Sequence, residues 1–285
     1  WLNSIEDSEL ALDVEKSLIV SGGSIASMFL NEEVKDYDIY LSKIDVVKRI
    51  AEYYTKGFPI DVLDGRDKAK IIKDYMGNRT EENINDVYNQ HAVALRTLHE
   101  NQIKLLMKEG GYATSQISEE GKYVPVYFSA NAISLSNNIQ IVLRFHGNVD
   151  EVHKTFDFVH ATNYFTFKDG LVTNSKALES LLSKQLIYQG SQYPLTSIIR
   201  SKKFIKRGFS ISAGEYLKIM FQISQLDLTN IDILEEQLIG VDVAYFSRLI
   251  EVLREHYGHN PSFKMTPEYL NTIIDRIFKE TENEE

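Results

Sequence analysis

The clearest pattern of apolar and polar positions lies near the start of the chain. The apolar run Leu18–Val20 leads into four small residues, Ser21–Ser24, and a short helical pattern follows over 25–30. Residues 36–40 then alternate between polar and apolar side chains, which predicts a strand because strand side chains alternate with a period of two. We therefore expect a strand, a glycine turn, a short helix and a second strand in this order.

Helices are predicted on both sides of this stretch. The apolar residues of 8–16 have an imperfect helical spacing. After the second strand, one apolar helical face predicts a helix over 44–56, with Ser42 as its N-cap and Gly57 as its end. A short apolar strand is expected over 58–63. This order of strands and helices is typical of a mixed sheet packed against helices.

Residues 66–122 have a different pattern, which is polar and helical. Apolar residues spaced along 84–109 predict a helix that ends at Gly110 and Gly111. We interpret the segment as a helical insertion into the sheet domain. Its sequence indicates no function.

The sheet is expected to resume after the insertion. Strands are predicted over 123–135, 139–145 and 155–161, with a turn at 136–138 between the first two. A hairpin follows within 165–173, in which an Asp-Gly turn joins two short strands. The second part of the sheet should therefore be built largely from hairpins.

From residue 174 onward the pattern is helical. Helices are predicted over 176–188, 196–206, 213–223 and 243–257, after Asn230 and from Thr266. Ser175 and Ser212 stand where N-caps are expected, and Gly208 stands where a helix ends. A sheet-rich part over 1–173 and a helical part over 174–285 together predict an α+β fold.

Composition narrows the class of protein. A chain of 285 residues with 43% hydrophobic residues is long enough for one large or two modest packed domains. The absence of cysteine excludes disulfides, thiolate catalysis and cysteine-ligated zinc. No apolar run reaches membrane-spanning length, so a soluble protein with no membrane partner is expected. The formal charge of −10 disfavours nucleic-acid binding over the whole surface, and a polynucleotide would need a local basic site.

Candidate chemistry is concentrated in the glycine turn and the strand that follows it. The turn consists of Ser21, Gly22, Gly23 and Ser24. Glycines let the backbone approach a phosphate closely, and serine hydroxyls and free N–H groups at a helix start can donate to it. Asp36 and Asp38 share one strand face and offer the hard oxygen ligands that Mg²⁺ or Mn²⁺ prefers. Each feature alone is common, since Asp-x-Asp on an edge strand is often a solvated face, but together they indicate a metal and phosphate site.

The same residues resemble a known signature. Gly23-Ser24, eleven intervening residues and Asp36-Tyr37-Asp38-Ile39 are similar to the signature of the DNA polymerase β-like nucleotidyltransferase superfamily, and look particularly like bacteriophage-encoded nucleotidyltransferase-like proteins. The segment 123–208 also resembles those phage proteins. The resemblance implies a nucleotidyltransferase-type catalytic domain over 1–173, with 66–122 inserted, and a C-terminal helical domain over 174–285.

The resemblance further implies a third carboxylate on a neighbouring strand, which helps bind the catalytic metal and activates the attacking hydroxyl. We assign this role to Asp157, the one acidic residue of an aromatic, apolar stretch, because a buried carboxylate is costly unless it is paired or bound to metal. Asp61 is the rival candidate. Either residue could instead cap a loop or pair with a core arginine.

A basic row lies on the helix predicted over 196–206. Helical spacing brings Arg200, Lys203 and Arg207 onto one side. Arg200 and Lys203 could hold the triphosphate or the acceptor, Arg through its planar fork and Lys as a point charge. A solvated basic face on an acidic protein is an equally good explanation.

These features predict a metal-dependent nucleotidyltransferase. A nucleoside triphosphate would place its phosphates on the glycine turn, and two Mg²⁺ ions would lie between it and Asp36, Asp38 and Asp157. A hydroxyl of RNA, a nucleotide, a small molecule or a protein would attack the α-phosphorus, and pyrophosphate would leave. A phage-encoded enzyme of this kind would act in the host cytoplasm. The alternative is a structural component of the phage virion, among virion partners, with an idle site.

Overall fold

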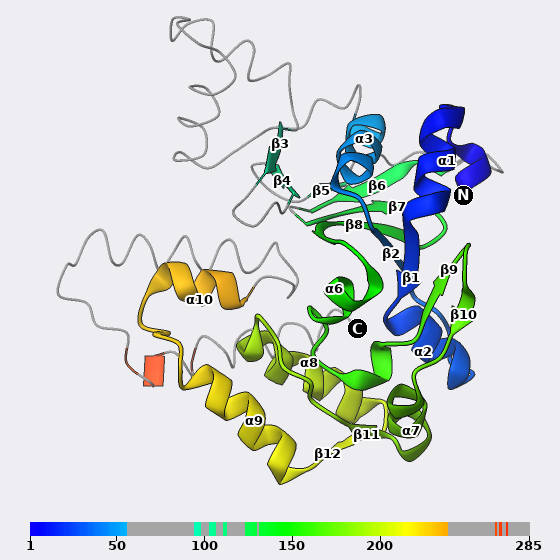
Figure 1. The fold of residues 1–285 in the computed structure, drawn as a ribbon. Coiled ribbons are helices and arrows are strands. Elements are labelled where there is room, and N and C mark those ends of the chain that lie inside the picture. The colour runs from blue at the N-terminus through cyan, green and yellow to red at the C-terminus, as the bar shows by residue number, and fades with distance from the viewer. Residues whose placement is uncertain are drawn as a thin grey trace, which may run out of the picture. The chain divides into compact units, whose positions relative to one another are not determined.

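The chain has an α+β fold that divides into two compact units (Figure 1). The computed structural model describes residues 1–55, 94–97, 103–106, 111–112, 123–129, 131–238, 266, 268–269 and 272. The first unit consists of Trp1–His153 with Ala161–Ala177, and the second of Lys154–His160 with Leu178–Glu285. None of the helices in these described ranges is long and apolar enough to cross a membrane.

An eight-stranded mixed sheet forms the centre of the first unit, with the strand order β10-β9-β1-β2-β8-β7-β6-β5. Its strands are β1 (Leu18–Ser21), β2 (Tyr37–Leu41), β5 (Gly111–Tyr112), β6 (Pro125–Phe128), β7 (Ala132–Leu135), β8 (Ile139–His146), β9 (Tyr164–Thr166) and β10 (Gly170–Val172). Neighbouring strands are antiparallel except β2 and β8, which run parallel. This parallel pair places residues far apart in the sequence side by side.

The helices of the first unit are η1 (Leu2–Ser4), α1 (Ser8–Ser17), α2 (Gly23–Phe29), α3 (Ile44–Thr55) and α6 (Val149–His153). The Asp7 side chain caps α1 by accepting the Leu10 N–H at 2.9 Å, which satisfies one of the free donors of a helix start. An ion pair between Arg49 and Asp13, at 2.6 Å, links α3 to α1. The strand, turn, helix and strand expected over the first 41 residues are therefore confirmed, as are the helices on both sides.

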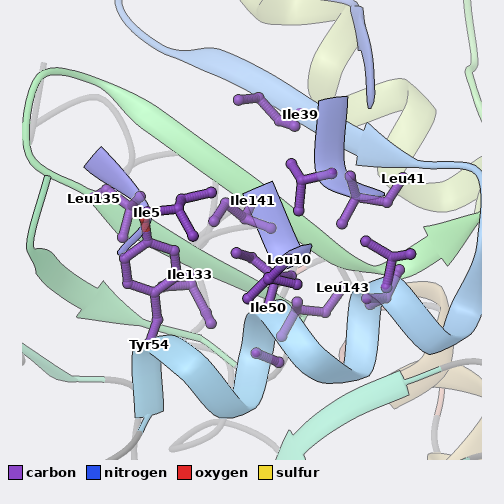
Figure 2. Packing of buried hydrophobic residues seen from close by; sticks show 14 of the residues in the cluster. Ile5, Leu10, Ile39, Leu41, Ile50, Tyr54, Ile133, Leu135, Ile141 and Leu143 are labelled. Carbon is purple, nitrogen blue, oxygen red and sulfur yellow. The ribbon is translucent and has the colours of Figure 1, made fainter. Parts of the chain in front are cut away.

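The hydrophobic core lies between one face of the sheet and helices α1 and α3 (Figure 2). Ile39 and Leu41 of β2 and Ile141 and Leu143 of β8 point into it, together with residues of both helices. Because strand side chains alternate, the residues next to them along each strand face the other side of the sheet. Asp38 is one of these residues, so the fold directs it away from the core.

Two hairpin turns of the sheet follow the sequence prediction. Asn137 and Asn138, between β7 and β8, have φ of 59° and 61°. Gly170, at the turn between β9 and β10, has φ of 66°. Asparagine and glycine adopt this left-handed region more readily than other residues, so both turns fit their sequence.

The prediction of a helix over 84–109 is wrong, because the residues of this segment that the structure describes form strands. β3 (Ala94–Thr97) and β4 (Ile103–Leu106) pair antiparallel, and β5 joins the main sheet beside β6. Ile103 and Leu105 alternate with Lys104, so the apolar spacing that fits a helix also fits a short strand. Pairing between the two segments decided between these structures.

Two predicted strands are also corrected. The run over 123–135 is broken at Ser129, whose hydroxyl accepts the Ala132 N–H at 3.0 Å, and it forms β6 and β7 instead of one strand. The run over 155–161 is a bend followed by η3 (Val159–Ala161). A continuous apolar run indicates burial but does not by itself specify a strand. The predicted strand 58–63, which contains Asp61, lies outside the described residues.

The described helices at the start of the helical part are α7 (Ser175–Ser183), α8 (Pro194–Lys206), α9 (Ala213–Ile223) and α10 (Ile231–Gln237). A parallel pair of short strands, β11 (Gln185–Leu186) and β12 (Ser210–Ile211), accompanies them. α7 is shorter than predicted, and Asn174 rather than Ser175 caps it, by accepting the Lys176 N–H at 3.0 Å. The predicted cap Ser212 is confirmed, since its hydroxyl accepts the Glu215 N–H at 3.3 Å. The predicted helix 243–257 and Gly57 lie outside the described residues.

Candidate nucleotide and metal site

A row of side chains crosses the face of the sheet opposite to the core. The strand register pairs Tyr164 with Ser21 and Asp38 with Gln140. Val20 pairs with Ile39, and continuing this register by one step brings Ser21 opposite Asp38. Residues opposite each other on paired strands project from the same face. We call Tyr164, Ser21, Asp38 and Gln140 the polar row.

The aspartate pair lies at the start of β2. Asp36 is exposed and immediately precedes the strand, and Asp38 is half-buried within it. The Gln140 side-chain amide donates to Oδ1 of Asp38 at 2.8 Å. The Tyr37 N–H donates to the Asn138 carbonyl at 2.7 Å, which fixes the backbone between the two aspartates. One carboxylate is thus held by a neighbouring strand, and the other is open to solvent.

The first half of the glycine turn is used by the protein itself. Gly22 has φ of 94°, a conformation that favours glycine, and its N–H donates to the Ala161 carbonyl at 3.1 Å. Ser21 is fully buried, and its hydroxyl donates to the Asn163 carbonyl at 2.8 Å. It also lies within hydrogen-bond distance of Nε2 of His153, at 2.9 Å, where the imidazole tautomer decides which group donates. These two residues tie β1 to the segment before β9.

The second half of the turn is the part that could meet a ligand. A Cβ built on Gly23 would have no atom within 4 Å in the described structure, so there is space for a phosphate to approach this backbone. The hydroxyl of Ser24 is buried, with the residue 2% exposed, and it has no hydrogen-bond partner among the described residues. A buried polar group without a partner is costly, and a bound phosphate would satisfy it.

Asp157 lies in the second unit, in the bend before η3, and not on a strand. It is 4% exposed. Its Oδ2 accepts from Nη1 of Arg200 at 2.6 Å, and its Oδ1 accepts from the hydroxyl of Ser191 at 2.8 Å. These contacts favour the pairing with a core arginine that the sequence left open. Its role as a third metal ligand stays a prediction.

The basic row on α8 divides into residues with different surroundings. Arg200 is engaged by Asp157, and the Arg207 guanidinium lies over the Phe204 ring at 5.9 Å from its centroid. Lys203 is exposed. Arg200 and Lys203 were both predicted to hold a triphosphate, and Arg200 has Asp157 as a structural partner.

The donor set of the site fits a divalent cation bound together with a nucleotide. Within the described ranges, no group of three His, Asp or Glu residues could hold a metal ion. Two carboxylates are the number that Mg²⁺ commonly takes from a protein when substrate phosphates and water complete its coordination. Asp36 and Asp38 therefore suit a metal that arrives with its nucleotide.

Two residues of this region were missed by sequence reasoning. Gln140 is flanked by Ile139 and Ile141 in a strand, which is the one available signal, and His153 ends a short helix. Burial lowers the pKa of His153 below its ordinary value, and the Asp150 carboxylate partly offsets this. Its ring meets that of Tyr164 edge to face at 5.7 Å. Gln140 positions Asp38, and His153 positions Ser21.

Comparisons with known proteins identify related sequences. A model of the Gabija anti-defense 2 family matches residues 1–184. The protein "Gabija anti-defense 2" of Bacillus phage SPbetaL7 is 24% identical over 113 residues, which are 39% of this chain and 28% of that protein. The matched stretch thus spans well under half of the phage relative.

Solved structures of CCA-adding enzymes have a weak overall similarity to the chain. The Thermotoga maritima enzyme complexed with tRNA is 14% identical with a TM-score of 0.39, and the match covers 93% of this chain and 56% of that one. The Bacillus stearothermophilus enzyme in complex with CTP is 11% identical with a TM-score of 0.40, and the match covers 83% of this chain and 47% of that one. The chain spans about half the length of each of these enzymes.

Proposed function

The chain belongs to the Gabija anti-defense 2 family, and from this premise we propose that it is a metal-dependent nucleotidyltransferase that counters the Gabija defence. The observation that carries the proposal is the arrangement at the ends of β1 and β2. The unpartnered hydroxyl of Ser24 and the accessible backbone of Gly23 follow one strand, and Asp36 and Asp38 begin the neighbouring strand. The resemblance of these residues to the polymerase β-like signature supports the same reaction.

Each residue of the site has a distinct task in this proposal. Gly23 lets a phosphate approach the backbone, and the Ser24 hydroxyl donates a hydrogen bond to it. Asp36 and Asp38 would hold Mg²⁺ or Mn²⁺, and Gln140 fixes the orientation of the Asp38 carboxylate by its 2.8 Å hydrogen bond. A divalent cation held there would supply charge neutralisation for the triphosphate and the leaving pyrophosphate.

The reaction transfers a nucleoside monophosphate to a hydroxyl acceptor. A bond forms between the acceptor oxygen and the α-phosphorus, and the bond from that phosphorus to the bridging oxygen breaks, which releases pyrophosphate. The acceptor hydroxyl gives up its proton to water in this step. The chain contributes mainly by holding donor and acceptor in line, as in other phosphoryl transfers. The assignment of Asp157 as the residue that activates the hydroxyl remains a prediction to be tested.

The family name adds a biological setting to the chemistry. A protein of a phage anti-defence family would use nucleotidyl transfer against a component or product of the host system. The family name speaks for this role over that of a virion component. The acceptor hydroxyl would then belong to the host, whether on RNA, a nucleotide, a small molecule or a protein.

The proposal is tested by transfer of label from α-labelled nucleoside triphosphates, with Mg²⁺ or Mn²⁺, in extracts of a host that carries the Gabija defence. Wild type is expected to label an acceptor, and Asp36→Asn/Asp38→Asn is expected to lose labelling by about two orders of magnitude or more. Asp45→Asn/Glu52→Gln removes the same number of charges from exposed positions of α3 and should remain active. Equal labelling by wild type and the Asp36/Asp38 variant would refute the proposed site.

The same variants can be compared in cells. Wild type and the α3 control are expected to restore phage plaques on a host protected by Gabija, and the Asp36/Asp38 variant is not. Restoration by the Asp36/Asp38 variant would separate the anti-defence role from nucleotidyl transfer.

A further inference from the structure

A cavity of about 360 Å³ opens in the first unit between α6 and the β9–β10 hairpin. Asn148, Asp150 and His153 line it from the side of α6, and Tyr164, Thr173 and Asn174 from the side of the hairpin. Its volume falls within the range of small-molecule sites, roughly 300–1,000 Å³. The cavity lies wholly within one compact unit, so its shape does not depend on how the two units are placed.

The cavity lies two strands away from the aspartate pair along the polar row. Tyr164, which lines the cavity, pairs with Ser21, and the next strand along the row contains Asp38. Neighbouring strands are about 4.8 Å apart, so the backbones at Tyr164 and Asp38 are separated by two strand spacings, roughly 10 Å. A ribose and base can bridge such a distance. His153 lines the cavity and also contacts Ser21 of the polar row.

The chemistry of the lining indicates an uncharged ligand rich in hydrogen-bonding groups. Amide, hydroxyl and carboxylate groups stand beside the Tyr164 ring, and among the described residues that line the cavity none is Lys or Arg. Burial lowers the pKa of His153, so its imidazole is neutral at pH 7 and supplies no positive charge beside the Asp150 side chain. A phosphate would meet a carboxylate without a compensating cation in this cavity, whereas a base could stack on the ring and a ribose could donate to the carboxylate.

We propose that this cavity binds the nucleoside part of a nucleotide whose phosphate end lies at the glycine turn and the aspartate pair. The proposal rests on the nucleotidyltransferase function proposed above and assigns a place to the base and sugar. The nucleoside can belong to the donor triphosphate or to a nucleotide acceptor. Both sources present the same chemistry to the cavity.

Calorimetric titration of the full chain with adenosine, guanosine, cytidine and uridine, without metal, tests the cavity directly. Thr173→Tyr puts a large side chain at an exposed lining position, and Leu171→Tyr makes the same substitution two residues earlier at a residue that is 55% exposed and outside the lining. At least one nucleoside should bind wild type. Thr173→Tyr should weaken this binding by about tenfold or more, and Leu171→Tyr should leave it within about twofold.

Competition decides between the two sources. If a non-hydrolysable triphosphate with Mg²⁺ displaces the bound nucleoside, the cavity holds the donor. If both bind together, it holds a nucleotide acceptor. Absence of nucleoside binding to wild type, or equal binding to wild type and Thr173→Tyr, would overturn the proposal.

Failure of the cavity can be separated from failure of the catalytic site. Asp36→Asn/Asp38→Asn should bind the free nucleoside as wild type does, because these residues contact the phosphate end. If that variant still transfers label, the proposed function fails while nucleoside binding stands. If wild type transfers label but binds no nucleoside, the cavity assignment fails alone.

Discussion

Removing the Arg200 guanidinium should reveal whether Asp157 is a structural residue. In Arg200→Met the helix α8 keeps a side chain of similar length and loses the charge that faces Asp157. The Asp157 side chain is 3% exposed and would lose its partner at 2.6 Å. Among the described residues, the Ser191 hydroxyl, at 2.8 Å, would still donate to it.

The expected loss of stability follows from the exposed fractions of the Asp157 and Arg200 side chains. Breaking a buried ion pair by removing one partner costs about 3–5 kcal/mol, because an uncompensated charge is left behind. The Arg200 side chain is 35% exposed, so solvent screens part of the interaction. We therefore expect Arg200→Met to lower the free energy of unfolding by about 2 kcal/mol. Lys203→Met, at an exposed position of the same helix, should change it by less than about 0.5 kcal/mol.

Urea unfolding at pH 7 provides the measurement, in a double-mutant cycle with Asp157→Asn. If the residues form a structural pair, the double variant should be more stable than the sum of the single effects predicts, by about 1 kcal/mol or more. It should also retain nucleotidyl transfer below its melting temperature. Equal stability of Arg200→Met and Lys203→Met would refute the structural interpretation. Loss of transfer in a stably folded Asp157→Asn would instead support the metal-ligand role.

Further variants test other parts of the molecule. Gln140→Leu removes the donor that orients Asp38, so it should reduce transfer by about tenfold while the urea midpoint is little changed, and unchanged transfer would contradict the positioning role. Burial, with a smaller effect of Arg207, lowers the pKa of His160 to about 4 from its ordinary 6.5. As pH falls through this window the unfolded chain takes up a proton that the folded chain does not, so stability should fall by about 2 kcal/mol at pH 5 relative to pH 7. His160→Leu should lose this part of the acid sensitivity in urea titrations at the two pH values, and an unchanged difference would contradict the assignment. Ser212→Ala removes the cap of α9 and should cost about 1 kcal/mol, measured by thermal unfolding, whereas no change would show that the cap adds nothing.

The local features of the first 55 residues could be predicted from the sequence. The alternation over 36–40, the small residues of the glycine turn and the apolar face of α3 each depend on neighbours within a few positions. The turns at Asn137 and Gly170 were equally local, because left-handed backbone selects these residue types. Such signals specify a helix, strand or turn regardless of what the element packs or pairs with.

The elements that were predicted wrongly depend on partners distant in the sequence. The segment with Ile103 and Leu105 has a spacing compatible with helix or strand, and antiparallel pairing with β3 selects the strand. The aromatic run around Phe158 and His160 was predicted to be a strand, but it makes an isolated antiparallel bridge, from Phe158 to Tyr188, and its rings pack against Phe204 at the end of α8 and Phe209 just after it. An apolar sequence predicts burial and leaves the backbone conformation open.

Some residues of the candidate site could likewise be predicted from local sequence, and others depend on the fold. Spacing alone placed Asp36 and Asp38 beside the glycine turn, since these residues belong to one short stretch of chain. Gln140 lies 102 residues from Asp38, and His153 lies 132 residues from Ser21. Their roles follow from the sheet register and the fold, and no local pattern marks them.

Binding of Mn²⁺ in the presence of a non-hydrolysable nucleoside triphosphate tests most directly whether the glycine turn and the aspartate pair hold a metal and a nucleotide together. Electron paramagnetic resonance would follow free Mn²⁺ during titration of wild type, Asp36→Asn/Asp38→Asn and the α3 control Asp45→Asn/Glu52→Gln. Wild type and the control are expected to take up Mn²⁺ with the nucleotide. The Asp36/Asp38 variant should bind Mn²⁺ at least about tenfold more weakly. Equal Mn²⁺ uptake by all three proteins would contradict the proposed site.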